Sequence, residues 1–73
     1  MSTKNPGIDV CLQIINTAIE EQLPLYKASK KLGKGKNYVY DMNKKIDERI
    51  QAKVITKTAG NEFKRAMKKY QSA

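Results

Sequence analysis

Two glycines separated by one lysine, Gly33 and Gly35, interrupt a lysine-rich segment that is otherwise patterned for helix. Glycine takes up the left-handed backbone conformation without steric cost, and it commonly ends a helix. Residues 25–32 follow helical spacing before the glycines, and helical spacing resumes near Lys36. The segment is therefore predicted to form two helices joined by a tight turn, and not one long helix.

The residues before this segment predict a first helix. It is expected to start at Asn5 and Pro6, since asparagine can cap a helix and proline suits the first helical position. Pro24 is expected to end it and to open the second helix. Its apolar residues cover about half of the helix circumference, which predicts contacts with two neighbours. These residues are Ile8, Val10, Cys11, Leu12, Ile14, Ile15, Ala18 and Ile19.

Two more helices are predicted after the glycines. The third is expected to begin near Lys36 and to end at Lys53 or Val54, where a β-branched run weakens the helical pattern. A break is expected in that run, and a short strand is the alternative. The fourth helix is expected from Thr56 or Thr58. The expected core faces are Val39, Met42, Ile46 and Ile50 on the third helix, and Ala59, Phe63, Ala66, Met67 and Tyr70 on the fourth.

These patterns predict an all-α fold, a small bundle of about four helices in a single domain of residues 6–73 after a disordered tail of residues 1–5. A chain of 73 residues is marginal as a monomer because it buries only about 60% of its unfolded surface. The sequence holds one cysteine and no histidine, so neither a disulfide nor a metal is expected to staple the fold. A homodimer is therefore expected through residues 46–72, with an interface of Ile50, Phe63, Met67 and Tyr70. The alternative for the fourth helix is that it folds back on its own chain.

The charge of the chain is uneven. Fifteen Lys and Arg residues oppose seven Asp and Glu residues, which gives +8. Residues 1–25 hold one lysine and three acids, a net −2, and residues 26–73 hold fourteen basic residues and four acids, a net +10. Positive charge gathered in one part of a small chain is typical of a polyanion binder. A lysine-rich solvated surface explains the charge equally well by itself.

Several classes of function lack support in the sequence. No serine or cysteine has a base at suggestive spacing, the acids form no paired motif, and Gly33 to Lys36 lack the full spacing of a phosphate-binding loop. No enzyme activity, cofactor, metal or small-molecule ligand is expected. The longest apolar runs are two residues, so no membrane partner is expected either. We expect a cytoplasmic protein, associated with the nucleoid if it binds DNA.

The residues around the turn form a recognisable pattern. Small residues before the turn allow two helices to cross closely, the leucine is expected to fill the space between them, and the residues after the turn point back to the shared core. The pattern consists of Ala28, Ser29, Leu32 and Gly33, followed by Val39 and Met42. Over residues 25–45 it resembles the helix-turn-helix superfamily of small repressors and related phage or plasmid regulators.

Two residues depart from that superfamily's usual pattern. Lys34 stands where an apolar residue is usual, and Gly35 stands where a serine or threonine often caps the second helix. Glycine is a slightly weaker cap than serine. These departures concern the rigidity of the turn more than its existence.

The resemblance implies a DNA-binding transcriptional regulator, most simply a repressor, that inserts the helix from Lys36 into the major groove. A homodimer would place two such helices about 34 Å apart, one turn of DNA. Asn37 suits adenine, and Tyr40 suits a thymine methyl group or a phosphate. Asp41 could accept from cytosine, with an ion pair to Lys44 or Lys45 as the alternative. The expected base-contacting residues are Lys36, Asn37, Tyr40, Asp41 and Lys44.

A second group of residues is expected to contact phosphates. Backbone N–H groups are free at the start of a helix and the helix dipole favours anions there, so residues 34–36 suit a phosphate clamp. The expected phosphate-contacting residues are Lys27, Lys30, Lys31, Lys34, Gly35 and Lys45. For the basic residues of the fourth helix, a solvated face and a contact are equally good interpretations; they are Lys57, Lys64, Arg65, Lys68 and Lys69.

Three other functions stay open at this point. The basic surface could dock on an acidic partner protein, which would make the chain an inhibitor or adaptor. The same face could bind and bend double-stranded DNA in an architectural or recombination-accessory role. RNA binding has less support, because no aromatic stacking platform is visible in the sequence.

Overall fold

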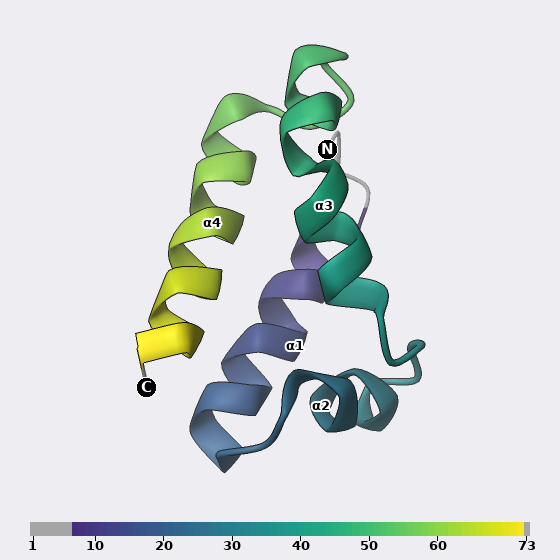
Figure 1. Cartoon of the computed structure of the whole chain (residues 1–73), viewed down its shortest axis with the longest axis vertical. Helices are drawn as coiled ribbons and strands as arrows, with labels where there is room; N and C mark the ends of the chain where they lie inside the picture. The colour runs from purple at the N-terminus through teal and green to yellow at the C-terminus, as the bar shows by residue number, and fades with distance from the viewer. Residues whose placement is uncertain (1–6, 73) are drawn as a thin grey trace.

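The structure is a computed structural model that describes residues 7–72, and these residues form four helices and no strand (Figure 1). The helices are α1 (Ile8–Glu21), α2 (Leu25–Lys31), α3 (Tyr38–Gln51) and α4 (Lys57–Ser72). The prediction of an all-α fold with about four helices is confirmed. The expected tail of residues 1–5 and the expected helix start at Asn5 and Pro6 lie outside the described residues.

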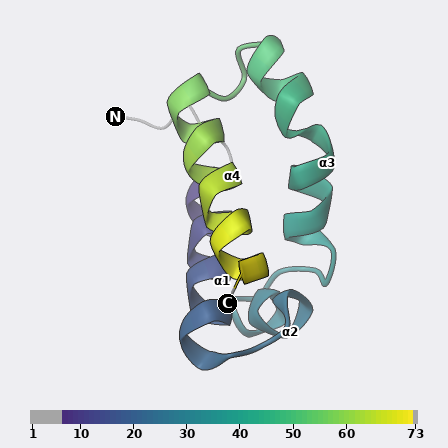
Figure 2. The ribbon, with the colours of Figure 1, turned by 60° about the vertical axis from the view of Figure 1, so that its left-hand side comes forward.

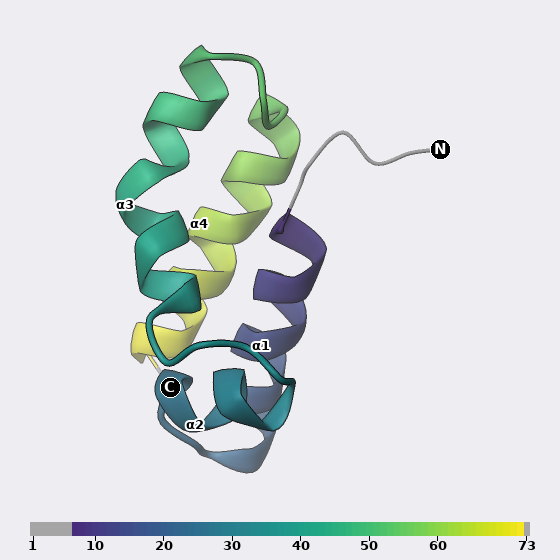
Figure 3. The ribbon, with the colours of Figure 1, turned by 90° about the vertical axis from the view of Figure 1, so that its right-hand side faces the viewer.

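Helix α1 is the centre of the fold, because it contacts each of the other three helices and its contacts with α4 and α2 are the most extensive of the bundle. Helices α3 and α4 run in opposite directions beside it, and α2 lies across its lower end (Figures 1 and 3). The broad apolar arc of α1 explains this position, although it meets three neighbours and not the predicted two. Its fully buried residues are Ile8, Cys11, Ile14, Ile15 and Ala18.

Cys11 is one of these core residues. Its side chain is fully buried, and this burial raises the pKa of the thiol to about 11, although the positive charge of Arg49 acts in the opposite direction. A thiol with a raised pKa stays protonated at neutral pH, and the protonated form is a poor nucleophile. Cys11 is therefore a small buried hydrophobic residue, as predicted.

The segment between α3 and α4 breaks the helical pattern where the β-branched run predicted a break. Helix α3 ends at Gln51, two or three residues earlier than expected, and Lys53 then takes a left-handed conformation with φ 62°. Helix α4 starts at Lys57, and the Thr56 hydroxyl oxygen accepts a hydrogen bond from the Ala59 N–H at 3.2 Å. Ile55, which was not among the expected core residues, is buried and fastens this loop to the core.

Helix α4 folds back on its own chain, and this corrects part of the predicted dimer interface. Phe63 is fully buried and Met67 is almost so, because both pack against the core that α1 provides. Neither side chain is available to a second chain in this fold, so their assignment to a dimer interface is wrong. Ile50 and Tyr70 are half-buried at the edge of the same core.

Gly60 marks the closest approach of α4 to α3. A methyl group on Gly60 would overlap the Ile50 side chain, with Ile50 Cγ1 only 2.9 Å away. Alanine normally stabilises a helix by about 0.5–1 kcal/mol relative to glycine. Here the overlap is expected to cost about 1–3 kcal/mol, so Gly60→Ala should lower the free energy of unfolding in a urea titration.

Gly35 provides the matched control for this substitution. No atom lies within 4 Å of the position that a methyl group on Gly35 would take. Gly35→Ala should therefore leave the free energy of unfolding within about 0.5 kcal/mol of the parent chain, as is usual for surface substitutions. A Gly60→Ala variant that is as stable as Gly35→Ala would show that α3 and α4 can move apart without cost.

Candidate nucleic-acid interface

The corner between α2 and α3 is built on small buried residues. Ala28 is fully buried and Ser29 is 1% exposed, so the two helices cross closely at these positions, as the sequence predicted. The Ser29 hydroxyl donates a hydrogen bond to the Gly35 carbonyl oxygen at 2.6 Å, which ties the end of the turn to α2. Gly33 takes a left-handed conformation with φ 80°, which confirms its predicted role in the turn.

Leu32 does not fill the space between the two helices, and the prediction that it does is wrong. Its side chain is 37% exposed. Helix α2 ends at Lys31, so Leu32 is the capping residue and no longer follows the buried face of the helix. Leu25, Ala28 and Val39 are buried at this corner instead.

The second helix of the corner starts later than expected. Helix α3 begins at Tyr38, so Lys36 and Gly35 belong to the loop and Asn37 is the capping residue, without a side-chain hydrogen bond. The prediction that Gly35 caps this helix is therefore wrong. The loop is fixed by backbone bonds, among them Tyr38 N–H to the Gly35 carbonyl at 3.2 Å.

The Ser29 hydrogen bond should be measurable in stability. Ser29→Ala removes one of the two donors to the Gly35 carbonyl, which still accepts from the Tyr38 N–H, and this is expected to cost about 0.5–1.5 kcal/mol. Ser72→Ala, an exposed substitution in the last turn of α4, is the control and should change little. Urea unfolding followed by circular dichroism measures both, and a Ser29→Ala variant as stable as this control would contradict the role of the bond.

The outward face of α3 carries the predicted reading residues. Val39, Met42 and Ile46 are buried, which turns the opposite face of the helix toward solvent. All five predicted base-contacting residues are exposed: Lys36 and Asn37 in the loop, and Tyr40, Asp41 and Lys44 on the helix. Tyr40 is 45% exposed. The structure thus exposes all five side chains, and their contact with DNA stays a prediction.

The predicted phosphate-contacting residues are exposed as well. Lys31 forms an ion pair with Glu21, and the Lys34 ammonium group lies 5.7 Å from the centre of the Tyr38 ring. Within residues 7–72 the other ion pair joins Lys64 and Asp47 at 2.6 Å. The remaining lysines of the corner therefore have no carboxylate partner among the described residues. They are Lys27, Lys30, Lys36, Lys44 and Lys45. The alternative predicted for Asp41, an ion pair with Lys44 or Lys45, is therefore not formed.

The sign of the charge changes along α3. Residues 36–45 hold three lysines and one acid, a net +2, and residues 46–51 hold two acids and one arginine, a net −1. Polyanions are attracted to clusters of positive charge. The loop and the first two turns of α3 therefore suit a phosphate-rich partner, and the last turn does not.

No protein-family model, no curated protein and no solved structure matches this chain. The likeness to helix-turn-helix proteins consequently remains a prediction from the residues. Among the described residues, none of the helices has the length and apolar character needed to cross a membrane. Within the same range, no three side chains of the metal-ligating types gather into a group.

Proposed function

We propose that the chain binds double-stranded DNA and regulates transcription, with the corner of α2 and α3 as its contact surface. One observation carries this proposal: Asn37, Tyr40 and Lys44 project outward from the start of α3, among lysines that have no carboxylate partner within residues 7–72. Helices of this size fit the major groove, and their N-terminal residues reach base edges.

The two kinds of contact have different tasks in this proposal. Lys34, Lys36 and the start of α3 bind phosphates, because positive charge and the helix dipole act together there, and this fixes the position of the helix on the duplex. Asn37 then pairs with an adenine edge, and Tyr40 contacts a thymine methyl group. Lys44 reaches a guanine or a further phosphate.

The proposal includes a homodimer. Tyr70 belongs to the predicted interface and remains partly exposed. It lines an open groove of about 650 Å³ between the ends of α1 and α4, and Ile19 and Leu23 line the same groove. A second copy seated at this groove would leave the corner of α2 and α3 free on each chain. Sedimentation equilibrium of the parent chain and of Tyr70→Glu tests this step, and a monomer at every concentration would remove the dimer from the proposal.

Selection of preferred duplexes from a random pool is the experiment that tests the function. Asn37→Ala and Tyr40→Ala should each lose the preference for one base position, which is worth about 1–3 kcal/mol, and keep the nonspecific affinity. Gln51→Ala, at the far end of the same helix, is the control and should keep the full preference. An unchanged preference in both test variants would move the reading surface elsewhere.

A second candidate function rests on a different observation. Tyr26, Leu32 and Tyr40 are large apolar side chains that are 45%, 37% and 45% exposed, and all three belong to the corner of α2 and α3. Tyrosine is enriched at protein–protein interfaces, so this surface could also dock on an acidic partner protein. Failure to bind any duplex at low salt would favour this candidate over the first.

A further inference from the structure

The outer face of α4 carries a stripe of positive charge that the proposed DNA contact does not use. Its residues follow one another at spacings of four, three and four, which places them on one side of the helix. The stripe is about 16 Å long at a rise of about 1.5 Å per residue. It consists of Lys57, Asn61, Lys64 and Lys68, all exposed, and it is flanked by Arg65 and Lys69.

The stability of α4 does not account for this stripe. Lys57 is the first residue of the helix, where the dipole disfavours a cation. Lys64 and Lys68 are like charges four residues apart, and such pairs destabilise a helix by about 0.2–0.5 kcal/mol each. Cations in the last turn do agree with the dipole, but Lys57 and Lys64 lie outside that turn.

Solubility alone does not explain the uneven distribution of these charges. Surfaces that are only solvated usually carry interspersed charges of both signs, whereas residues 57–72 hold five basic residues and one acid, Glu62. The partner of Lys64 comes from α3, and the Asp47 side chain is 78% exposed, so solvent screens this pair. The outer face of α4 thus remains strongly positive.

The side chains of the stripe indicate the class of partner. They are lysines and an amide, with no apolar or aromatic residue among them. Protein–protein interfaces have apolar, aromatic-rich centres and few lysines, and single-stranded nucleic acids bind on exposed aromatic rings. Phosphate groups of a duplex are bound by side chains of the kinds found in the stripe. Tyr70 is a partly exposed aromatic residue of the same helix, but it packs against the core and does not belong to the stripe.

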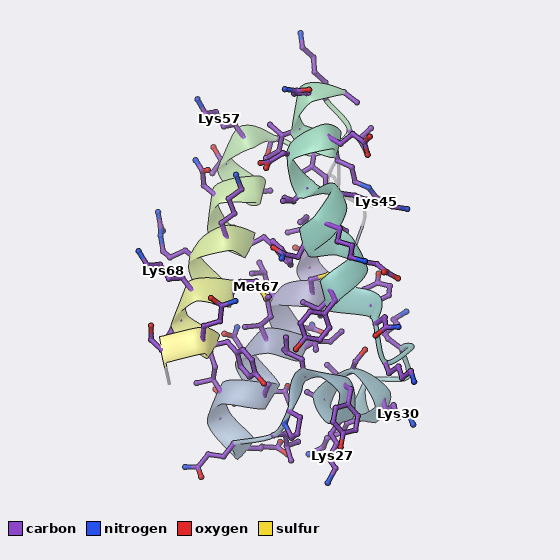
Figure 4. The ribbon with its side chains drawn as sticks, in the orientation of Figure 1. Lys27, Lys30, Lys45, Lys57, Met67 and Lys68 are labelled. Carbon is purple, nitrogen blue, oxygen red and sulfur yellow. The ribbon has the colours of Figure 1, made fainter. Side chains whose placement is uncertain are left out.

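The stripe and the proposed reading surface lie on different sides of the molecule. Lys57 and Lys68 project from one side, and Lys30 and Lys45 project from the other (Figure 4). Turning the molecule brings α4 forward in Figure 2, whereas the loop between α2 and α3 comes forward in Figure 3. Because these lysines point to opposite sides (Figure 4), a straight duplex bound at the corner does not reach Lys57 or Lys68.

We propose that the outer face of α4 binds the phosphate backbone of a second duplex, so that one chain bridges two DNA segments. This inference rests on the proposed function, because the first duplex is the one bound at the corner of α2 and α3. The α4 contact reads no sequence, since lysines bound to phosphates carry no information about bases. It should also weaken steeply as salt increases.

Energy transfer between two differently labelled duplexes measures bridging, and fluorescence anisotropy of one duplex measures binding at the corner. The parent chain should bring the two labels together. The variant Lys57→Gln/Lys64→Gln/Lys68→Gln should bind its preferred duplex within about threefold of the parent affinity and lose at least about nine tenths of the energy transfer. Lys57→Gln/Lys68→Gln, which keeps the ion pair of Lys64 with Asp47, should also lose most of the energy transfer. Sedimentation equilibrium should show that both variants keep the oligomeric state of the parent chain.

The two measurements separate the possible failures. If the parent chain binds single duplexes but does not bridge them, or if both variants bridge like the parent, this inference is overturned and the proposed function stands. If the parent chain binds no duplex, both are overturned. Equal bridging by parent and variants, combined with weaker retention of the variants on a polyglutamate column, would assign the stripe to an acidic protein and overturn the inference.

Discussion

Phe63→Ala is expected to remove a large part of the stability of this protein. Phe63 is fully buried and is the largest side chain buried to that extent. Truncation of a buried phenylalanine to alanine costs about 3–5 kcal/mol, because apolar contacts are lost and a cavity remains. A domain of this size has a total stability of about 4–11 kcal/mol, so the variant should be partly unfolded at moderate temperature.

The same experiment tests whether α4 packs within its own chain. If Phe63 fills the core of its own chain, the melting temperature of the Tyr70→Glu variant, which removes the proposed homodimer contact, should not depend on protein concentration. If Phe63 met a second chain, the melting temperature would rise with concentration by mass action. Thermal unfolding at two concentrations about 50-fold apart distinguishes the two cases, and a clear rise would contradict in-chain packing.

Tyr70→Ala is the matched control on the same helix. Tyr70 is an aromatic residue at the edge of the core, with part of its ring exposed. Its truncation should cost clearly less than that of Phe63, because less apolar surface leaves contact with other atoms. Equal losses in the two variants would mean that α4 is packed in a different rotation.

The sequence predicted the four helices because their apolar residues recur at helical spacing over at least two turns. The half-apolar circumference of α1 also indicated a helix with more than one neighbour. The spacing shows which face of a helix is buried, but not which chain covers it. For that reason Phe63 and Met67 were correctly placed on a buried face and wrongly assigned to a partner chain.

Errors in the sequence prediction are concentrated where the helical pattern stops. Leu32 fits the spacing of α2, but the helix ends one residue earlier, and the side chain turns outward. Ile55 is isolated from any periodic run, so nothing in the sequence identified it as buried. The start of α3 lacks a side-chain cap, so the sequence carries no signal that separates a start at Tyr38 from the predicted start near Lys36.

The exposure of the candidate site was easier to predict than its detailed contacts. Because Val39, Met42 and Ile46 had to be buried, the residues opposite them had to face solvent, and they do. The hydrogen bond from Ser29 to the Gly35 carbonyl was outside the reach of pattern analysis, since it depends on the conformation of the whole loop. The pairing of Lys31 with Glu21 likewise joins residues of two different helices.

Binding of DNA at the corner of α2 and α3 is expected to depend steeply on salt. The logarithm of the association constant falls by about 0.9 for each phosphate contacted when the logarithm of the salt concentration rises by one. With about five lysines of the corner on phosphates, an increase from about 50 to 200 mM salt should weaken binding roughly 500-fold. Anisotropy of a labelled, preferred duplex at nanomolar concentration measures this slope.

Two lysines of the loop provide the variant that tests the origin of the slope. Lys34 and Lys36 are exposed beside the start of α3, so Lys34→Gln/Lys36→Gln should reduce the slope by about 1.8 if each contacts one phosphate. Lys57→Gln/Lys68→Gln is the control, because it also removes two charges, both from the outer face of α4, and should leave the slope at the preferred duplex unchanged. A slope near zero for the parent chain would show that phosphates contribute nothing at this corner. An equal reduction in the control and the test variant would show instead that the affinity follows net charge, without a defined contact.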